Sequence, residues 1–137
     1  MTDATDLALV RCKVNEGFRP QKYLDTRGFT TIGYGFNVDA GISEFAAATL
    51  LEAQLAEAEA DVSNFDWYPS VDGVRKSVLV ELCFNMGIHK LQGFKLMLAA
   101  CSRSDWTDAA LQLQQSAWFS QVGQRGPQLV RLLRDGG

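Results

Sequence analysis

Residues 16–36, EGFRPQKYLDTRGFTTIGYGF, decide how the first part of the chain folds. Before them, apolar residues recur at the helical spacing i, i+3 and i+7 over residues 7–14, which predicts one face of a helix. Gly17 predicts the end of that helix at Glu16, because glycine takes up the left-handed C-terminal conformation at little cost.

Two short runs typical of β-strands follow, residues 23–25 and 29–36. Residues 26–28, Thr-Arg-Gly, suit the connection of a hairpin. If the second run is one strand, Gly33 and Gly35 share a face and leave a strip of bare backbone that a ligand can approach closely. The alternative for these glycines is a bulge or bend in a twisted ribbon.

The rest of the chain has helical patterns. Residues 43–64 predict one long connecting helix, with Ser43 able to cap its start. Every segment after Pro69 is predicted to be helical, with Gly87 ending one helix and residues 128–134 forming the last. The sequence therefore predicts an α+β fold with one small β region.

Composition narrows the class of protein. A chain of 137 residues fits one compact domain, or two small lobes that share a helix. Its 47% of hydrophobic and 21% of charged residues are ordinary for a soluble globular protein. No apolar run is long enough to span a membrane, and the polar residues 1–6 do not resemble a secretory signal. The net charge is −3, and no dense Lys/Arg cluster with interleaved aromatic residues favours nucleic acid.

Cysteine usage predicts thiols rather than a metal site. The chain has three cysteines, Cys12, Cys83 and Cys101, and no Cys-x-x-Cys pattern. We expect buried or half-buried free thiols, with one disulfide plus one free thiol as the alternative. His89 is the only histidine, so a zinc site is not expected.

The candidate chemistry lies at Glu16, Asp25 and Thr31. A helix end facing a hairpin can bring a carboxylic acid, a second carboxylate and a hydroxyl around one cleft. Glycoside hydrolysis needs such a set, since one acid protonates the leaving oxygen and a carboxylate supports the cationic transition state or the attack of water. Carboxylates near hairpins are also commonly caps or surface groups, so this pattern alone leaves both interpretations open.

The order of these residues adds a resemblance. Glu16, then Asp25, then Thr31 within a Thr-Ile-Gly-x-Gly run resembles the lysozyme family of tailed phages in residue type and spacing. The resemblance continues to about residue 134, through segments that include Phe84-Asn85-Met86-Gly87, Gly93-Phe94, residues 106–110, residues 116–119 and Arg125. It implies a lysozyme-like α+β fold: a small N-terminal lobe with a β-hairpin, joined by a long helix to a larger helical lobe.

That fold implies one domain over residues 1–137. The small lobe is expected over about residues 15–45 and the connecting helix over about residues 43–64. The helical lobe is expected over about residues 66–137, together with the N-terminal helix at residues 5–15.

The family also implies an activity, that of an endolysin-type muramidase. Glu16 would be the general acid on the β-1,4 bond that follows N-acetylmuramic acid. Asp25 would stabilise developing positive charge and orient water. Thr31 would hold the attacking water on the opposite face, as in inverting glycosidases. The resemblance implies no metal and no organic cofactor.

Further residues are expected to bind the substrate. The family implies that five line the sugar groove: Tyr23, Gly35, Phe84, Asn85 and Phe94. Arg125 would contact carboxylates of the peptide stems, or would be an ordinary exposed charge. For Phe94, the alternative is a core residue.

One departure from the family pattern is Phe36, which stands where relatives usually have His after Gly-x-Gly. A second is the short link between residues 36 and 42, which predicts a small first lobe. Two other functions remain open on this sequence, a non-catalytic peptidoglycan-binding module and a lytic transglycosylase. We expect a monomer whose partner is bacterial peptidoglycan, with neither nucleic acid nor a stable membrane association. Its expected location is the host cytoplasm until a holin-type pore releases it, or the virion.

Overall fold

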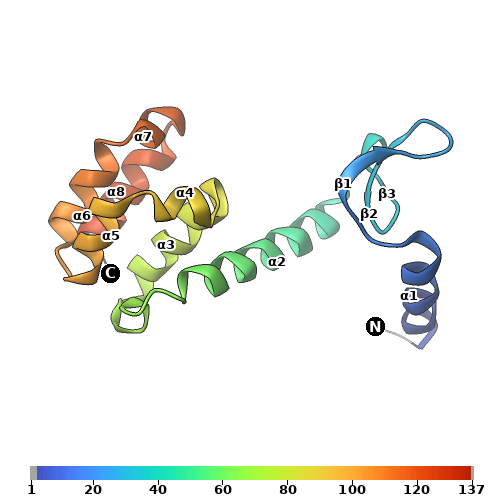
Figure 1. Ribbon diagram of the computed structural model, residues 1–137, viewed down its shortest axis with the longest axis horizontal. Helices are drawn as coiled ribbons and strands as arrows, with labels where there is room; N and C mark the ends of the chain where they lie inside the picture. The colour runs from blue at the N-terminus through green and yellow to red at the C-terminus, as the bar shows by residue number, and fades with distance from the viewer. Residues whose placement is uncertain (1–2, 137) are drawn as a thin grey trace. The chain divides into compact units, whose positions relative to one another are not determined.

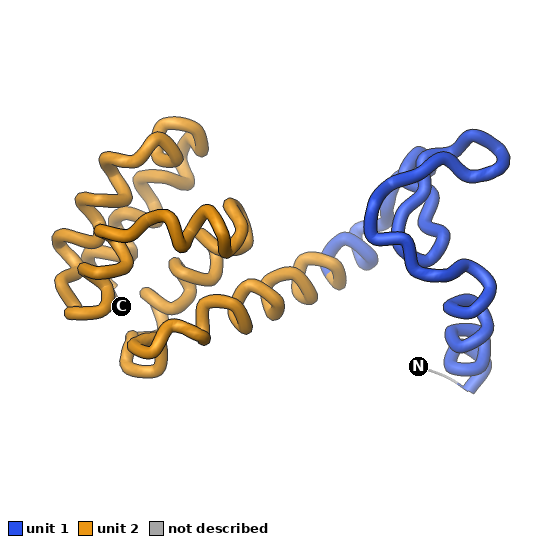
Figure 2. Tube along the Cα trace, in the orientation of Figure 1, with its two compact units in different colours: residues 1–48 blue, residues 49–137 orange. Residues whose placement is uncertain are grey.

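The computed structural model describes residues 3–136, and the chain forms two compact units. Unit 1 comprises residues 1–48 and unit 2 comprises residues 49–137 (Figure 2). The long helix α2 (Glu44–Val62) begins in the first unit and continues into the second (Figure 1). The predicted connecting helix is confirmed, with slightly narrower bounds.

Before α2 begins, the described part of unit 1 forms a helix and a small sheet. Its elements are α1 (Asp3–Glu16), β1 (Arg19–Leu24), β2 (Thr30–Gly33), β3 (Phe36–Asn37) and the 3-10 turn η1 (Val38–Ala40). Helix α1 ends at Glu16 as predicted. Gly17 follows with φ +68°, and its N–H donates to the Lys13 carbonyl at 3.0 Å.

The sheet is antiparallel in the order β1-β2-β3. Tyr23 lies opposite Thr31, which in turn lies opposite Asn37. The prediction of one strand over residues 29–36 is wrong, because the chain turns between β2 and β3. Gly33 (φ +70°) and Gly35 (φ +81°) supply the left-handed backbone that this turn requires, so the bend was the correct alternative.

Unit 2 is helical, as predicted. After the end of α2 come the 3-10 turn η2 (Tyr68–Ser70), α3 (Gly73–Met86), α4 (Ile88–Gln92), α5 (Lys95–Ser102), α6 (Trp106–Gln114), α7 (Ala117–Gln121) and α8 (Arg125–Asp135). Helix α8 begins earlier than the predicted residue 128. Pro127 lies in its first turn, where the missing N–H breaks no hydrogen bond of the helix.

Local caps explain several of the helix ends. The Ser43 hydroxyl accepts from the Ala46 N–H at 3.1 Å at the start of α2. Asp72 and Asp105 do the same for α3 and α6, accepting from N–H groups three residues on at 3.2 and 3.1 Å. Gly87, at φ +85°, ends α3 as predicted.

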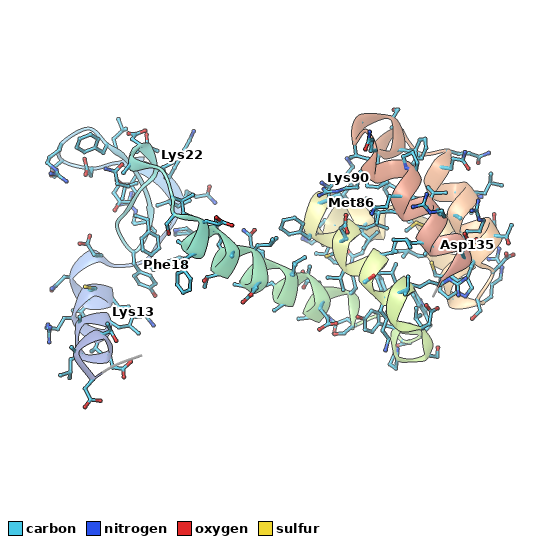
Figure 3. The ribbon with its side chains drawn as sticks, turned by 180° about the vertical axis from the view of Figure 1, so that it is seen from behind. Lys13, Phe18, Lys22, Met86, Lys90 and Asp135 are labelled. Atoms are coloured by element: carbon cyan, nitrogen blue, oxygen red, sulfur yellow. The ribbon has the colours of Figure 1, made fainter. Side chains whose placement is uncertain are left out.

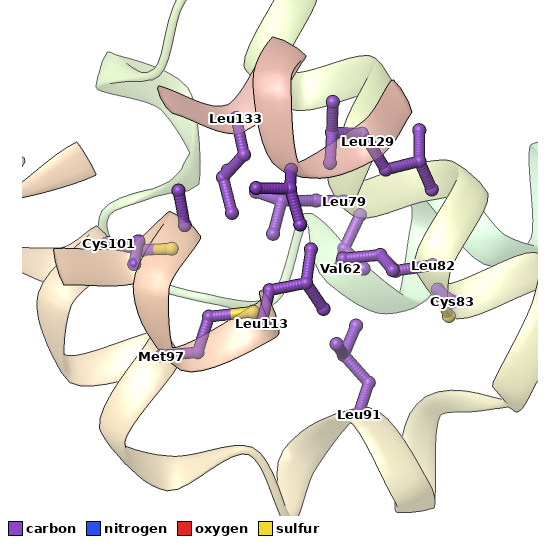
Figure 4. Packing of buried hydrophobic residues seen from close by; sticks show 14 of the residues in the cluster. Val62, Leu79, Leu82, Cys83, Leu91, Met97, Cys101, Leu113, Leu129 and Leu133 are labelled. Carbon is purple, nitrogen blue, oxygen red and sulfur yellow. The ribbon is translucent and has the colours of Figure 1, made fainter. Parts of the chain in front are cut away.

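The hydrophobic core lies in unit 2. Leu79, Leu82 and Leu113 are fully buried there, and Figure 4 shows them packed with side chains from the other helices of this unit. In the described part of unit 1, Thr31 is the one buried residue, at 4% exposure. The α+β class is thereby confirmed, while the assignment of residues 5–15 to the helical lobe stays a prediction.

The burial of the cysteine side chains differs between the two units. All three cysteines are free; Cys83 and Cys101 are buried in unit 2, as predicted. Cys12 is exposed, so the expectation of burial was wrong there, because α1 buries none of its described residues. No helix within residues 3–136 is long and apolar enough to cross a membrane.

Candidate active site

Asp25 lies at the end of β1, where its side chain organises the hairpin. Its Oδ1 accepts hydrogen bonds from the backbone N–H groups of Phe29 and Arg27, each at 2.9 Å. The backbone of Asp25 also pairs with Phe29, its N–H donating to the Phe29 carbonyl at 2.9 Å. The bond from Phe29, then that from Arg27 and the Arg27 charge, hold the pKa of Asp25 below its usual value. Asp25 is therefore a carboxylate that stays ionised.

Thr31 is joined to Asp25 through the backbone of Phe29. The Thr31 hydroxyl donates to the Phe29 carbonyl oxygen at 2.9 Å, and the residue is 4% exposed. A hydroxyl has one proton and two lone pairs, so this hydroxyl can still accept a hydrogen bond from a water molecule. The hairpin thus fixes both predicted hydrolytic partners through one intervening residue.

Glu16 closes α1 and lies against the turn between β2 and β3. A Cβ atom built on Gly35 would lie 2.7 Å from Cδ of Glu16, so the carboxyl group packs directly on the Gly35 backbone. Two contacts join α1 and the residues that directly follow it to this turn. The Phe18 and Tyr34 rings lie 5.5 Å apart between centroids, and the Lys13 ammonium lies 5.8 Å from the Tyr34 centroid. Figure 3 labels Lys13 and Phe18 in this unit.

Unit 1 therefore brings together Glu16 and Gly35, and separately joins Asp25 to Thr31. Tyr23 is half-buried on β1, with the Arg19 guanidinium 4.0 Å from its ring centroid. Phe36, at the position where the family pattern has His, places its ring over Gly33, where an added Cβ would meet Cδ2 at 3.0 Å. An apolar ring thus fills that place beside the turn.

The predicted groove residues of unit 2 fall at separate places. Asn85 accepts a hydrogen bond from the Trp118 indole N–H at 2.8 Å. Phe94 and Trp118 line a pocket of about 410 Å³, whereas Phe84 lines a different pocket of about 230 Å³. Phe94 also packs on the core, as its alternative interpretation has it, and its contact with the substrate stays a prediction.

Arg125 is paired rather than an isolated charge. Its Nε lies 3.2 Å from Glu81 Oε2, and the two side chains are 38% and 39% exposed. The guanidinium remains accessible enough to meet a ligand while Glu81 holds it in place.

Sequence reasoning missed Asp39, which supports the strand that carries Thr31. Its Oδ2 accepts from the Thr30 N–H at 2.8 Å. Asp39 lies nine residues from Thr30 along the chain, so no local sequence pattern predicts this contact. Within residues 3–136, no group of three or more His, Cys, Asp or Glu side chains is placed to hold a metal ion.

The arrangement in unit 1 suits acid-assisted bond cleavage. Glu16 offers an exposed carboxyl group beside bare backbone, and Asp25 offers an ionised carboxylate fixed by N–H groups. Thr31 adds a hydroxyl that can accept from water. These are the group types that glycoside hydrolysis uses.

Comparison with known proteins finds several relatives of the chain. The chain is 23% identical to a probable T4-type lysozyme 1 of Dictyostelium discoideum over 155 residues, covering 90% of this chain and 91% of the relative. A probable T4-type lysozyme 2 of the same organism matches with the same identity and coverage. The pre-baseplate central spike protein Gp5 of Enterobacteria phage T4 is 24% identical, with 89% of this chain and 26% of that protein covered. The model of the phage lysozyme family matches residues 13–134, which contain Glu16, Asp25 and Thr31. With its α+β fold and a match over most of its length, the chain belongs to the phage lysozyme family.

Proposed function

We propose that this chain is a muramidase that hydrolyses the β-1,4 bond between N-acetylmuramic acid and N-acetylglucosamine in bacterial peptidoglycan. The observation that carries the proposal is the packing of the Glu16 carboxyl group on Gly35, in the unit whose hairpin fixes Asp25 and Thr31. Membership of the phage lysozyme family supports the same reaction class.

In this mechanism Glu16 donates its proton to the glycosidic oxygen as the bond to the anomeric carbon breaks. The ionised Asp25 stabilises the positive charge that develops on the sugar ring. Thr31 accepts a hydrogen bond from the attacking water, which adds from the opposite face and releases one proton. Solvent then reprotonates Glu16. The product has the inverted configuration.

The substrate contacts belong to the proposal as well. We propose that the glycan meets Tyr23, Gly35, Phe84, Asn85 and Phe94, and that Arg125 meets carboxylates of the peptide stems. No cofactor takes part. The chain acts as a monomer on the wall, either after release through a holin-type pore or as part of the virion. The relative Gp5 is itself named as a spike protein.

Clearing of purified peptidoglycan by the wild type and by Glu16→Gln tests whether Glu16 is the general acid. The substitution keeps the shape of the side chain and removes the proton donor, so we expect activity to fall by at least about a hundredfold. Glu52→Gln is the matched control, since Glu52 is exposed on α2. Equal clearing by all three proteins would mean that Glu16 is not the acid.

The products decide the type of reaction. Hydrolysis leaves a reducing end, and NMR of the fresh product shows the anomeric configuration. We expect the α-anomer first, because attack from the opposite face inverts a β-bond. A 1,6-anhydro end would make the chain a lytic transglycosylase. Binding to walls without new ends would make it a non-catalytic module.

A further inference from the structure

The peptide group between Phe29 and Thr30 lies at the centre of the hydrogen bonds of the hairpin. Its carbonyl oxygen accepts from the Thr31 hydroxyl and from the Asp25 N–H, each at 2.9 Å. Its N–H donates to Oδ2 of Asp39 at 2.8 Å. Because a trans peptide group is planar, its N–H and C=O point in opposite directions, and a bond at one end helps to fix the other. Asp39 therefore helps to orient the carbonyl group that Thr31 and Asp25 share.

The pairing of β2 with β3 stops just before Thr30, and the Asp39 carboxylate takes the place of the strand there. The two strands are antiparallel, with Thr31 opposite Asn37. The next pair in this register would join Thr30 to Val38, but at Val38 the chain already enters η1 (Figure 1). A carboxylate that accepts from an N–H makes a stronger bond than the carbonyl of a neighbouring strand would. The contact is thus a substitute for sheet pairing at the residue before Thr31.

The turn that carries Asp39 is itself held by hydrogen bonds. Oδ1 of Asn37 accepts from the Ala40 N–H at 3.3 Å, and the Gly41 N–H donates to the Val38 carbonyl at 3.1 Å. The backbone of Asp39 is therefore fixed on both sides, so its short side chain is aimed at β2 by the turn.

The orientation of the shared carbonyl decides which part of the Thr31 hydroxyl can meet water. The hydroxyl has one proton and two lone pairs, and its proton is used on the Phe29 carbonyl. If the peptide group rotated, that proton could turn toward the water, and the hydroxyl would donate where the proposed reaction needs an acceptor. The Asp39 carboxylate also polarises the peptide group, which makes its carbonyl oxygen a better acceptor. Asp39 therefore acts on the hydroxyl of Thr31 through one peptide group.

We propose that Asp39 is a positioning residue for hydrolysis, which keeps the lone pairs of the Thr31 hydroxyl available to the attacking water. It does so by holding the peptide group between Phe29 and Thr30, and it takes part in no bond that forms or breaks. The inference rests on the proposed function, in which Thr31 accepts a hydrogen bond from that water. A purely structural Asp39 would stabilise the hairpin, but its effect on turnover would not depend on the Thr31 hydroxyl.

Kinetics of the full chain on soluble glycan strands test the effect on turnover. Asp39→Ala removes the acceptor, so we expect kcat to fall by at least about tenfold while KM changes by less than about twofold, because the substrate still binds but water is poorly placed. Asp39→Asn keeps an oxygen that can accept from Thr30 and should restore most of kcat. Asp6→Ala is the matched control, since it removes an exposed carboxylate from α1 of the same unit. Equal kcat for Asp39→Ala and the control, or no rescue by Asp39→Asn, would overturn the inference.

A double-mutant cycle shows whether Asp39 acts through Thr31. Thr31→Val removes the hydroxyl and nearly keeps the shape of the side chain, and it should itself lower kcat. In this background Asp39→Ala should lower kcat further by less than about twofold, because no hydroxyl is left to orient. Two losses that multiply would mean that Asp39 acts independently of Thr31, and the inference would then be wrong.

NMR of the labelled chain tests the placement without any need for activity. The Phe29 carbonyl ¹³C and Thr31 amide signals should shift in Asp39→Ala and stay in place in Asp6→Ala, while unchanged signals of unit 2 show that both variants fold. Unshifted signals at Phe29 and Thr31 would refute the inference. If the wild type cuts no glycan bond, the muramidase fails and the inference falls with it. If the wild type and Asp39→Ala cut equally fast, the muramidase stands and only the inference fails.

Discussion

At the scale of single residues, the most informative contact is that between Glu16 and Gly35. Glycine is required at position 35 for two reasons, its φ of +81° and the carboxyl group that lies where a Cβ would be. A side chain there would push the carboxyl group away from the turn. The glycine at position 35 therefore helps to set where the carboxyl group of Glu16, the proposed acid, lies.

Gly35→Ala is therefore expected to abolish most activity. The left-handed backbone costs about 1–2 kcal/mol for alanine, and the new methyl group displaces Glu16. Gly123→Ala is the matched control: its φ is +61°, and nothing lies within 4 Å of its added Cβ. Both variants should lose similar stability in urea denaturation, but only Gly35→Ala should lose activity. Equal activity of the two variants would show that the contact does not place Glu16.

The hydrogen bonds of Asp25 predict an acid-sensitive hairpin. The pKa of this carboxyl is lowered in the folded chain, by the Phe29 N–H first and then by Arg27. Its contribution to stability is thus fully present above the ordinary aspartate pKa and is lost as pH falls through the lowered value. A carboxyl ¹³C titration should place the Asp25 midpoint below the ordinary aspartate value. A midpoint equal to or above the ordinary value would contradict this.

The thiols should differ in reactivity. Burial raises the pKa of Cys101 to about 12, and burial together with the Asp61 charge raises the pKa of Cys83. Cys12 is exposed. At pH 8, one thiol of the native chain should react quickly with a disulfide reagent, and Cys12→Ser should remove that fast phase. All three thiols should react in denaturant. Two fast-reacting thiols in the native chain would contradict the burial of Cys83 and Cys101.

At the scale of elements, α6 shows how a helix is held by one face. Leu113 is fully buried, while Leu111, two residues earlier on the same helix, is 46% exposed. The helix begins at the Asp105 cap and packs its buried face into the core of unit 2. Helical propensity is the same for the two leucines, so only their environment separates them.

Leu113→Ala should cost about 2–5 kcal/mol of unfolding free energy, because it leaves a cavity in a packed core. Leu111→Ala should cost less than about 1 kcal/mol, since part of its surface is already in water. Chemical denaturation of the two variants measures the difference. Similar losses would mean that the face of α6 is assigned wrongly.

At the scale of the whole molecule, burial is concentrated in unit 2. The described core residues run from Ala58 to Leu133, whereas Thr31 is the one buried residue in the described part of unit 1. The proposed catalytic residues therefore lie in the unit with less buried apolar surface. Local opening there costs less free energy than opening of the core.

Hydrogen exchange of the full chain should reflect this division. The slowest backbone amides are expected on α3, α6 and α8, and the amides of β1 and β2 should exchange earlier. Mass spectrometry of peptides from a labelled chain measures both groups in one experiment. Equal protection of β2 and α6 would show that unit 1 is stabilised by contacts as extensive as those of the core.

The sequence by itself determined the class of fold, most helix limits and the candidate catalytic residues. Helix ends such as Ser43 and Gly87 depend on local hydrogen bonds and backbone angles, which neighbouring residues reveal. The phage lysozyme resemblance was confirmed by the family match over residues 13–134. The roles of Glu16, Asp25 and Thr31 stay predictions.

Only the tertiary structure decided the contacts that join distant segments. It divided residues 29–36 into two strands, packed Glu16 on Gly35 and joined Asp39 to Thr30. It also gathered Lys90 and Lys95 at a pocket with Trp118. Such contacts depend on how separate elements pack, and the packing free energy is a sum over many residues that no local pattern contains.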